Sequence, residues 1–194
     1  MKIISAPHQT LRQKAIEVKT VDKKLIKFIE ELELTLKNKE NPKGVGLAAP
    51  QVDKKLRIFT TQLSNIDNFD DENSLEIKHY INPIITKHAG KQTFGPDKNN
   101  PQLEGCLSIP KIYAPVPRWE WVELEYMMLE NGKLIPQKER FDDFYARVIQ
   151  HEADHLDGIL FTDYALEYDL PVYFENNKTG KLEETTNISV LETL

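Results

Sequence analysis

The residues best suited to chemistry lie in one short run, VIQHEADHLDG, at positions 148–158. This run places His151 and His155 four residues apart, with Glu152 directly after the first histidine. On a helix, positions four apart lie about 40° apart around the axis, so both imidazoles would share one face and could bind one divalent metal ion. Glu152 would then reach water beside that ion without being a ligand. The alternative interpretation is a polar helix with two half-exposed histidines.

A hydrolytic metal site of this kind needs a third protein ligand, and three positions come into question. One zinc-protease pattern places a histidine six residues after the second, but that position here is Phe161. Glu175 lies farther downstream in a stretch that we expect to be irregular. Cys106, in the segment EGCLSIP at 104–110, is the strongest candidate, because a thiolate binds zinc or ferrous iron well and Gly105 lets the loop bend. The alternative role for a lone cysteine is that of a small buried hydrophobic residue.

A third stretch, GVGLAAPQ at 44–51, combines two glycines with a terminal glutamine. Gly44 and Gly46 permit a close backbone approach that larger residues would block. The stretch lacks the GxGxxG and GK[ST] patterns of phosphate-binding loops. Gln51 carries a neutral amide that could donate a hydrogen bond to a developing oxyanion. The alternative interpretation is a tight turn between a helix and a strand.

Two helices are expected to position these segments. Apolar residues recur at helical spacing after Asp22, a suitable N-cap, and this first helix should end before the Asn-Pro-Lys-Gly sequence at 41–44. A second helix is expected to begin at Asp142 or Asp143 and to finish at Gly158, because glycine commonly follows the last helical turn. The HExxH residues therefore lie on this second helix.

Antiparallel strands are expected between the two helices. Alternating apolar and polar residues, with β-branched and aromatic side chains, favour strands at 56–60, 80–86, 121–129 and 133–141. The last two flank Asn131 and Gly132, which are typical of a hairpin turn. Pro136 predicts that the return strand is an edge or bulged strand.

Two polar segments, 62–76 and 88–102, interrupt this pattern. Both are rich in Asn, Asp and Lys and show neither helical nor strand periodicity. We therefore expect loops on the solvated surface.

The composition limits the classes of function. A chain of 194 residues fits one domain with a hydrophobic core. Its formal net charge of -6 argues against broad electrostatic attraction to nucleic acid or to an anionic membrane surface. No apolar run approaches the roughly 20 residues that span a bilayer, and no secretory pattern begins the chain, so we expect a cytoplasmic protein. The single cysteine excludes an internal disulfide.

Together, GVGLAAPQ, EGCLS and QHEADH resemble the three signature motifs of the peptide deformylases, in that family's order. The resemblance extends over about 11–162 and leaves 163–194 as a C-terminal extension of a single catalytic domain, 1–194. It implies an α+β fold in which antiparallel strands pack around a central helix that carries HExxH. It also implies hydrolytic removal of the formyl group from the N-terminal formylmethionine of newly synthesised polypeptides, with release of formate.

The resemblance further implies roles for individual residues. The metal ligands become Cys106, His151 and His155. Glu152 becomes the general base and later the general acid. The side-chain amide of Gln51 and the backbone N–H of Leu107 become the hydrogen-bond donors to the oxyanion.

Contacts with the substrate are expected on both glycine-containing motifs. The peptide backbone should pair in extended form with Val45, Gly46 and Gly105. Val45 and Val148 are expected to line the apolar pocket for the methionine side chain, since Val148 shares the helix face that bears the histidines.

Two further polar residues of the helical motif, Gln150 and Asp154, suit positions from which hydrogen bonds orient metal ligands. Arg118 and Arg147 are alternative partners for the Asp154 carboxylate.

The resemblance implies one divalent metal ion per chain, with ferrous iron (Fe2+) native and Zn2+, Ni2+ or Co2+ able to occupy the site. The expected partners are N-formylmethionyl nascent peptides. Residues 183–194 contain three acids and no lysine or arginine, so we expect at most a transient ribosome contact. We expect neither direct nucleic acid binding nor membrane association, and a monomer.

Two other classes of function compete with the deformylase. A zinc peptidase would use HExxH but leaves the cysteine and glycine motifs unexplained. A binding protein with a degenerate site would commonly have lost at least one of the five residues Gln51, Cys106, His151, Glu152 and His155.

Overall fold

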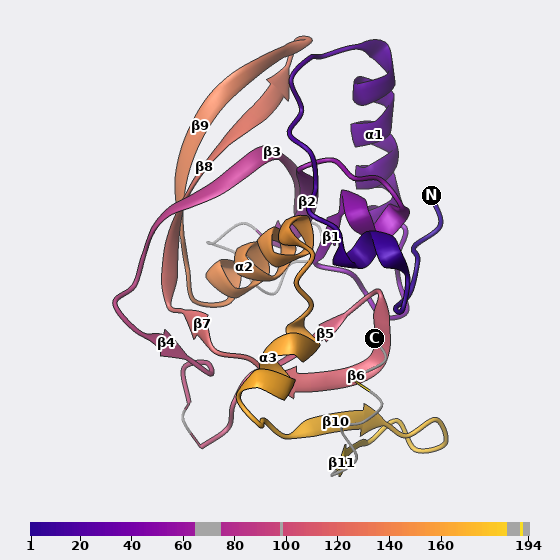
Figure 1. Ribbon diagram of the computed structural model, residues 1–194, viewed down its shortest axis with the longest axis vertical. Helices are drawn as coiled ribbons and strands as arrows, with labels where there is room; N and C mark the ends of the chain where they lie inside the picture. Colours follow the sequence, from indigo (N-terminus) through magenta and orange to yellow (C-terminus); the bar gives the residue numbers. More distant parts are fainter. Residues whose placement is uncertain (65–74, 98, 186–190, 192–194) are drawn as a thin grey trace.

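The computed structural model describes residues 1–64, 75–97, 99–185 and 191, and it confirms the expected α+β fold with antiparallel sheets (Figure 1). The helices, with 3-10 helices written η, are η1 (Gln9–Arg12), α1 (Lys23–Lys37), η2 (Ala49–Val52), α2 (Asp143–Asp157) and α3 (Phe161–Glu167). The strands are β1 (Gly46–Ala48), β2 (Ile58–Ser64), β3 (Leu75–His88), β4 (Gln92–Thr93), β5 (Leu103–Cys106), β6 (Ile109–Pro115), β7 (Arg118–Trp119), β8 (Trp121–Glu130), β9 (Lys133–Asp142), β10 (Val172–Glu175) and β11 (Leu182–Thr185).

Helix α1 begins where its N-cap predicts. The Asp22 carboxylate accepts a hydrogen bond from the backbone N–H of Leu25 at 2.7 Å and so caps the first turn. Its buried apolar face contacts β1, β2 and β3 and consists of Leu25, Ile29, Leu32 and Leu36. The helix ends at Lys37, and the following segment leads the chain into β1. This helix therefore packs against the sheet whose strand β1 belongs to the glycine-containing segment 44–51.

The largest sheet has five strands in the order β1-β2-β3-β8-β9. Its β8–β9 hairpin turns at Asn131 and Gly132, whose φ angles of 49° and 75° lie in the left-handed region that these residues tolerate. The predicted hairpin is thereby confirmed. Pro136 lies in β9, and β9 forms an edge of the sheet, as a strand with a missing backbone donor should.

The described residues also form two smaller sheets. Four strands follow the order β11-β10-β6-β5, and β4 pairs with β7. Strand β1 is one edge of the five-stranded sheet, and β5 is one edge of the four-stranded sheet. Each of the two glycine-containing motifs therefore includes an edge strand that is open to further pairing.

Helix α2 lies between the sheets (Figure 1) and contacts β1, β2, β7, β8 and β9. Its buried residues are Ala146, Arg147, Val148, Ile149, Gln150, Glu152, His155 and Leu156. Four of these buried side chains are polar or charged. Each must therefore have hydrogen-bond partners in the interior or serve a function. The central helix predicted to carry HExxH is confirmed.

The prediction of a loop at 62–76 was wrong at both ends of that segment. The strand expected at 56–60 begins at Ile58 and runs to Ser64, and the next strand begins at Leu75. Polar residues such as Gln62 belong to the sheet because β2 pairs with β3 along its whole length. The middle of the expected loop, 65–74, lies outside the described residues.

The second predicted loop and the C-terminal region also contain strands. Within 88–102, the short strand β4 pairs with β7. The segment that ends at Glu175, expected to be irregular, is strand β10, which pairs with β6 on one side and β11 on the other. Pairing partners distant in the sequence stabilise these short strands, and local composition does not reveal such partners.

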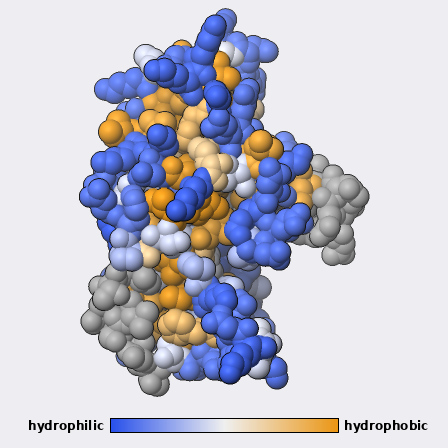
Figure 2. Space-filling view, turned by 90° about the vertical axis from the view of Figure 1, so that its right-hand side faces the viewer, coloured by the Kyte–Doolittle hydropathy of each residue, from blue (hydrophilic) through white to orange (hydrophobic). Residues whose placement is uncertain are grey.

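In the described residues, buried apolar side chains form three clusters. One of them includes Cys106 and joins β5 and β6 to α3 through Ile109, Ile112, Leu160 and Phe161. On the face shown in Figure 2, apolar side chains gather in a central band between polar regions. No helix in the described part of the chain is long and apolar enough to cross a membrane.

Candidate active site

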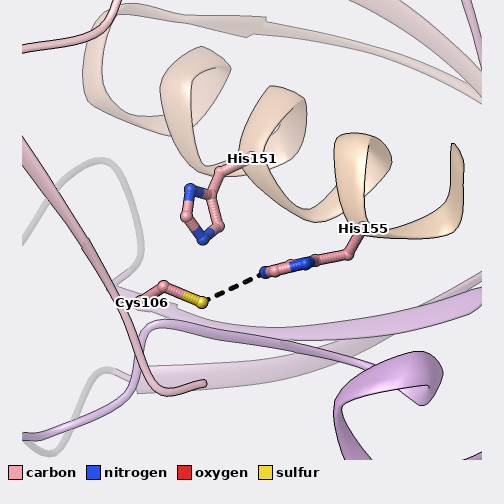
Figure 3. A group of neighbouring side chains, drawn as sticks. All are labelled: Cys106, His151 and His155. Atoms are coloured by element: carbon pink, nitrogen blue, oxygen red, sulfur yellow. Dashed lines mark hydrogen bonds between the residues drawn. The ribbon is translucent and has the colours of Figure 1, made fainter. Parts of the chain in front are cut away.

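Three side chains that can bind a metal ion converge at the centre of the molecule, namely Cys106, His151 and His155 (Figure 3). One ligand atom from each lies within 4.8 Å of the other two. Cys106 Sγ is 3.3 Å from His155 Nε2, and the two imidazole rings are 5.0 Å apart at an angle of 87°. Within the described ranges no other group of three such residues occurs.

Helix α2 sets the spacing of the two histidines. Because it is regular from Asp143 to Asp157, His151 and His155 lie one turn apart on the same face. The helix ends at Gly158, whose φ of 76° is left-handed, and a Cβ at this position would lie 2.7 Å from the backbone carbonyl carbon of Arg12. Glycine therefore permits both the helix end and the close packing of η1 against it.

Cys106 approaches the histidines from the end of β5. The β5–β6 register shifts between Gly105 and Cys106, so the strand bends at the cysteine. The backbone N–H of Ser108 donates a hydrogen bond to Cys106 Sγ at 3.4 Å. The cysteine is largely buried, but its sulfur lies against His155 Nε2, so apolar packing alone does not account for its position.

The three donor atoms fit a divalent metal ion. Sulfur and nitrogen ligands of tetrahedral zinc lie about 2.3 and 2.0–2.1 Å from the ion, so they are roughly 3.6 Å apart. The 3.3 Å between Cys106 Sγ and His155 Nε2 is close to this separation. Burial, aided by the charge of His151, lowers the pKa of His155 well below its usual value, so this imidazole is neutral, as a ligand must be.

Glu152 lies between the two histidines in sequence but outside the ligand group. It is 3% exposed, and its Oε2 has no hydrogen-bond partner among the described residues. Burial raises the pKa of this carboxyl from 4.5 to about 7, against the opposing charge of His151. Gly46 leaves the carboxylate its space, because a Cβ there would lie 2.2 Å from Glu152 Oε1. A carboxyl with a pKa near neutral can both accept and return a proton.

Gln51 is held with its amide N–H groups towards the ligands. Its Oε1 accepts a hydrogen bond from the backbone N–H of Ala48 at 2.8 Å. This contact turns Nε2 towards Cys106 Sγ at 3.4 Å and Ser108 Oγ at 3.3 Å. The side chain is buried, so a fixed hydrogen-bond donor lies next to the candidate ligand Cys106.

A cavity of about 620 Å³ is lined by Cys106, His151 and Glu152. The sequence-predicted contact residues that line it are Val45, Gly46, Gly105, Leu107 and Val148. Val45 is exposed, whereas Val148 is buried in the wall. The cavity thus brings together the glycine segment, the cysteine segment and α2, which are distant in the sequence.

The other two positions considered for a third ligand serve different contacts. The Phe161 ring stacks on His151, with centroids 6.2 Å apart and planes at 29°. Glu175 lies in the cavity wall, where its carboxylate accepts a hydrogen bond from the Tyr113 hydroxyl at 3.2 Å. Neither residue belongs to the group of ligand atoms.

Glu104 is a central residue that the sequence reasoning missed. Its Oε2 lies 3.1 Å from His151 Nδ1, which leaves His151 Nε2 for a metal ion. Its carboxylate also accepts hydrogen bonds from Arg118 Nε and Nη2 at 3.0 and 2.9 Å, and from Arg147 Nη2 at 3.1 Å. A signal existed in the sequence, because alternate residues of a strand share a side, and Glu104 precedes Cys106 by two positions.

The charges around Glu104 determine how it and His151 titrate. Burial acts to raise the pKa of Glu104, but the Arg118 guanidinium and the His151 imidazole together outweigh it and hold that pKa well below its usual range. Burial likewise acts to lower the pKa of His151, but its contacts with Cys106 and Glu104 outweigh this effect and raise the pKa. An ionised Glu104 therefore orients the His151 ring through Nδ1, and a metal ion would displace the proton from Nε2 on binding.

Arg118 rather than Arg147 is the partner of Asp154. Arg118 Nη1 donates to Asp154 Oδ2 at 2.5 Å, so this arginine joins Asp154 to Glu104. Arg147 instead donates to Glu104 and, at 2.6 Å, to the backbone carbonyl of Val116. Hydrogen bonds thus connect Asp154 to His151 through Arg118 and Glu104.

Gln150 holds α2 against β7 rather than orienting a ligand. Its Oε1 accepts from the Trp119 backbone N–H at 3.0 Å, and its Nε2 donates to the Trp119 carbonyl at 2.9 Å. The expectation that Gln150 orients a metal ligand was wrong, because β7 offers its side chain both a backbone donor and a backbone acceptor.

Replacing Glu104 by glutamine should destabilise the fold. Glutamine keeps the shape of the side chain but removes the charge that faces Arg118 and Arg147, both of which are buried. Leaving a buried charge without its partner costs about 3 kcal/mol, so we expect the free energy of unfolding in urea to fall by about that amount.

The matched control for this change is Glu125→Gln, because Glu125 forms an exposed ion pair with Lys138. Exposed pairs contribute roughly 0–1 kcal/mol, so its unfolding midpoint should stay near that of the unmodified protein. Equal midpoints for the two variants would show that Glu104 does not stabilise the site.

Comparisons with known proteins agree on one family. The family model described as polypeptide deformylase matches residues 1–169. Peptide deformylase 2 of Nostoc sp. is 38% identical over 164 residues, which cover 84% of this chain and 84% of that protein. Peptide deformylase 1 of Bacillus cereus is 35% identical over 168 residues, which cover 87% of this chain and 94% of that protein.

Solved structures show the same likeness. A peptide deformylase from Synechococcus elongatus in complex with actinonin aligns with a TM-score of 0.69 and 36% identity, covering 84% of this chain and 79% of that one. A peptide deformylase from Thermotoga maritima aligns with a TM-score of 0.68 and 31% identity, covering 84% of this chain and 95% of that one.

Proposed function

Because this chain belongs to the peptide deformylase family, we propose that its cavity holds the formylated N-terminus of a nascent peptide beside a metal ion bound by Cys106, His151 and His155. Members of the family are hydrolases that remove the N-formyl group from N-formylmethionyl peptides, and this is the activity of the chain. The convergence of the three ligand atoms within 4.8 Å is the observation that supports the proposal most strongly.

The family is one of metalloenzymes, and one thiolate and two imidazoles suit several divalent ions. We propose one ion per chain, with Fe2+ as the native metal and Zn2+, Ni2+ or Co2+ as substitutes. When bound, such an ion supplies water with a pKa near 7 and polarises the formyl oxygen.

Glu152 is the proposed proton carrier. It accepts a proton from the water that attacks the formyl carbon and later returns it to the nitrogen of the departing amine. Its buried position and raised pKa support both steps near neutral pH. The products are formate and a peptide with a free N-terminus.

Gln51 and Leu107 are the proposed oxyanion donors. The attacked formyl carbonyl gains negative charge on its oxygen, and fixed donors stabilise that charge more than they stabilise the neutral substrate. Gln51 supplies an amide N–H that is already held towards the ligands. Leu107 supplies its backbone N–H from the cavity wall next to Cys106.

The substrate backbone is proposed to bind as an extended strand between two sheet edges. Val45 and Gly46 lie at β1 and Gly105 lies in β5, and both strands are edges that can accept a further strand. The methionine side chain then enters the pocket lined by Val45 and Val148. A substrate held on both sides in this way has its formyl group directed towards the metal ligands.

We propose that residues 1–194 act as one catalytic domain, with the motifs within about 11–162 and an extension at 163–194. The pairing of β10 with β6 supports the attachment of this extension to the motif-bearing part. We further propose that the enzyme acts as a monomer in the cytoplasm on nascent chains, with at most a transient ribosome contact.

Replacing Gly46 by alanine should lower kcat/KM for a formyl-methionyl-alanyl-serine peptide by about 10²-fold, because a displacement of roughly 1 Å at a catalytic group costs that much. The added Cβ would lie 2.2 Å from Glu152 Oε1, so the carboxylate must move. Formate release by the metal-loaded protein is the measurement.

Gly90→Ala is the control, because a Cβ at Gly90 meets no atom within 4 Å. Equal rates for the two variants would contradict the position assigned to Glu152. Absence of formate release from the unmodified, metal-loaded protein would overturn the proposed function itself.

A further inference from the structure

Glu175 brings a carboxylate to the active-site cavity from outside the matched part of the chain. The family model ends at residue 169, whereas Glu175 is the last residue of β10. Nevertheless, β10 pairs with β6, and Glu175 lines the same cavity as Cys106 and His151. The likeness to the family therefore assigns Glu175 no role, although its position beside the substrate path calls for one.

The cavity wall near Glu175 is a continuous surface formed by three strands. Gly105 in β5, Tyr113 in β6 and Glu175 in β10 all line the cavity. The Tyr113 ring covers Gly105 so closely that a Cβ on Gly105 would lie 2.7 Å from a ring carbon. The Tyr113 hydroxyl donates to Glu175 Oε2 at 3.2 Å, which fixes the carboxylate at the end of the ring.

The Glu175 carboxylate accepts a hydrogen bond from Tyr113. Among the residues that the structure describes, it has no cationic partner. Lys111, on the neighbouring strand and in the same wall, donates its ammonium group to Asn177 Oδ1 instead. Burial, together with the Glu175 carboxylate, raises the pKa of the Tyr113 hydroxyl, so this hydroxyl stays protonated and donates. The acceptor capacity of the carboxylate is therefore left for a ligand in the cavity.

Other charges around the cavity limit where a cationic ligand can bind. Lys39 and Lys43 line the cavity from the segment before β1, and Arg147 lies in its wall, bound to Glu104. The other carboxylates that line the cavity, Glu104 and Glu152, lie beside the proposed metal ligands, so Glu175 is the carboxylate available on the β10 side.

We propose that Glu175, with Tyr113, forms a subsite for a lysine or arginine side chain at the second or third residue of the formylated peptide. This inference rests on the proposed function, since it requires a substrate strand beside β5. Neighbouring strands lie about 4.8 Å apart, so the long stem of lysine or arginine can cross Gly105 along the Tyr113 ring. Its charged end then meets the Glu175 carboxylate.

The test compares formate release from amidated formyl-methionyl tripeptides that differ at one residue. Lysine and glutamine are placed in turn at the second and third positions, and the remaining position is alanine. At one of the two positions, the metal-loaded protein should prefer lysine over glutamine in kcat/KM by about three- to fivefold, the range expected for one partly exposed ion pair. The preference should decrease at high ionic strength, because salt screens such a pair.

Two variants test the assignment to Glu175. Glu175→Gln should reduce the lysine-to-glutamine ratio to about one, and Glu175→Lys should make the lysine peptide the poorer substrate. The matched control is Glu183→Gln, because Glu183 is exposed on β11, pairs with Phe174 and is absent from the cavity wall. This control should keep the lysine preference.

The outcomes separate this inference from the proposed function. Formate release from the glutamine peptides without a lysine preference at either position would overturn the Glu175 subsite alone. A lysine preference that persists in Glu175→Gln would also overturn it, because another group would then recognise the charge. No formate release from any peptide would overturn the proposed function.

Discussion

Replacing Glu152 by glutamine should lower kcat/KM for formyl-methionyl peptides by about 10³-fold, within the range that one general acid–base group contributes. Glutamine has nearly the same shape, but its amide can neither accept the proton of water nor return it to the amine. Since Glu152 is not among the three ligand atoms, the variant should still bind one metal ion per chain. Formate release and metal content, measured on the same preparation, check both statements.

The control for this experiment is Glu167→Gln, because Glu167 is an exposed residue at the end of α3. Its kcat/KM should match that of the unmodified protein. If Glu152→Gln retained activity within tenfold, the proton would have to travel through another group, and the assignment would be wrong. Cleavage of an internal peptide bond by the unmodified protein would instead favour a peptidase.

Replacing Cys106 by serine should remove most of the bound metal and, with it, most of the activity. A serine hydroxyl is a much weaker ligand than a thiolate, and the two histidines alone leave the ion with too few protein donors. We expect the bound metal to fall below about one tenth of an ion per chain after dialysis and kcat/KM to fall by about 10³-fold.

Circular dichroism should show an unchanged fold in this variant, because serine differs from cysteine by one atom. Retention of one tightly bound ion per chain would mean that the third ligand is a different residue. Glu175 would then return as a candidate, since it lies in the same cavity.

Local signals in the sequence were sufficient for several elements. Helix α1 has an N-cap at Asp22 and a buried stripe at helical spacing, and both follow from the order of residues within that one segment. The end of α2 follows from Gly158, and the β8–β9 hairpin follows from Asn131 and Gly132. These predictions succeeded because the residues that determine the structure are neighbours in the chain.

Elements that depend on distant partners were missed. Strands β10 and β4 are short, and they form because β6 and β7 offer them unpaired edges. The same reason explains the omission of Glu104, whose contacts with Arg118, Arg147 and His151 bring together three separate segments. Its position two residues before Cys106 was the only local signal.

The choice of the third ligand required both the residue types and the fold. The sequence left Phe161, Glu175 and Cys106 as positions to consider, and the chemistry of the thiolate favoured the cysteine. The structure places Cys106 Sγ 3.3 Å from His155 Nε2, whereas Phe161 stacks on a histidine ring and Glu175 bonds to Tyr113. The chemistry of the side chains favoured Cys106 as the third ligand, and the geometry supports the same residue.

X-ray absorption at the zinc edge, on protein loaded with one Zn2+ per chain, tests most directly that Cys106, His151 and His155 hold the metal ion. The spectrum should fit one sulfur at about 2.3 Å and two imidazole nitrogens at about 2.0–2.1 Å, with the remaining ligand a light atom. The Cys106→Ser variant, loaded under the same conditions, should lose the sulfur contribution. A spectrum of the unmodified protein without sulfur, or with fewer than two imidazoles, would contradict the proposed site.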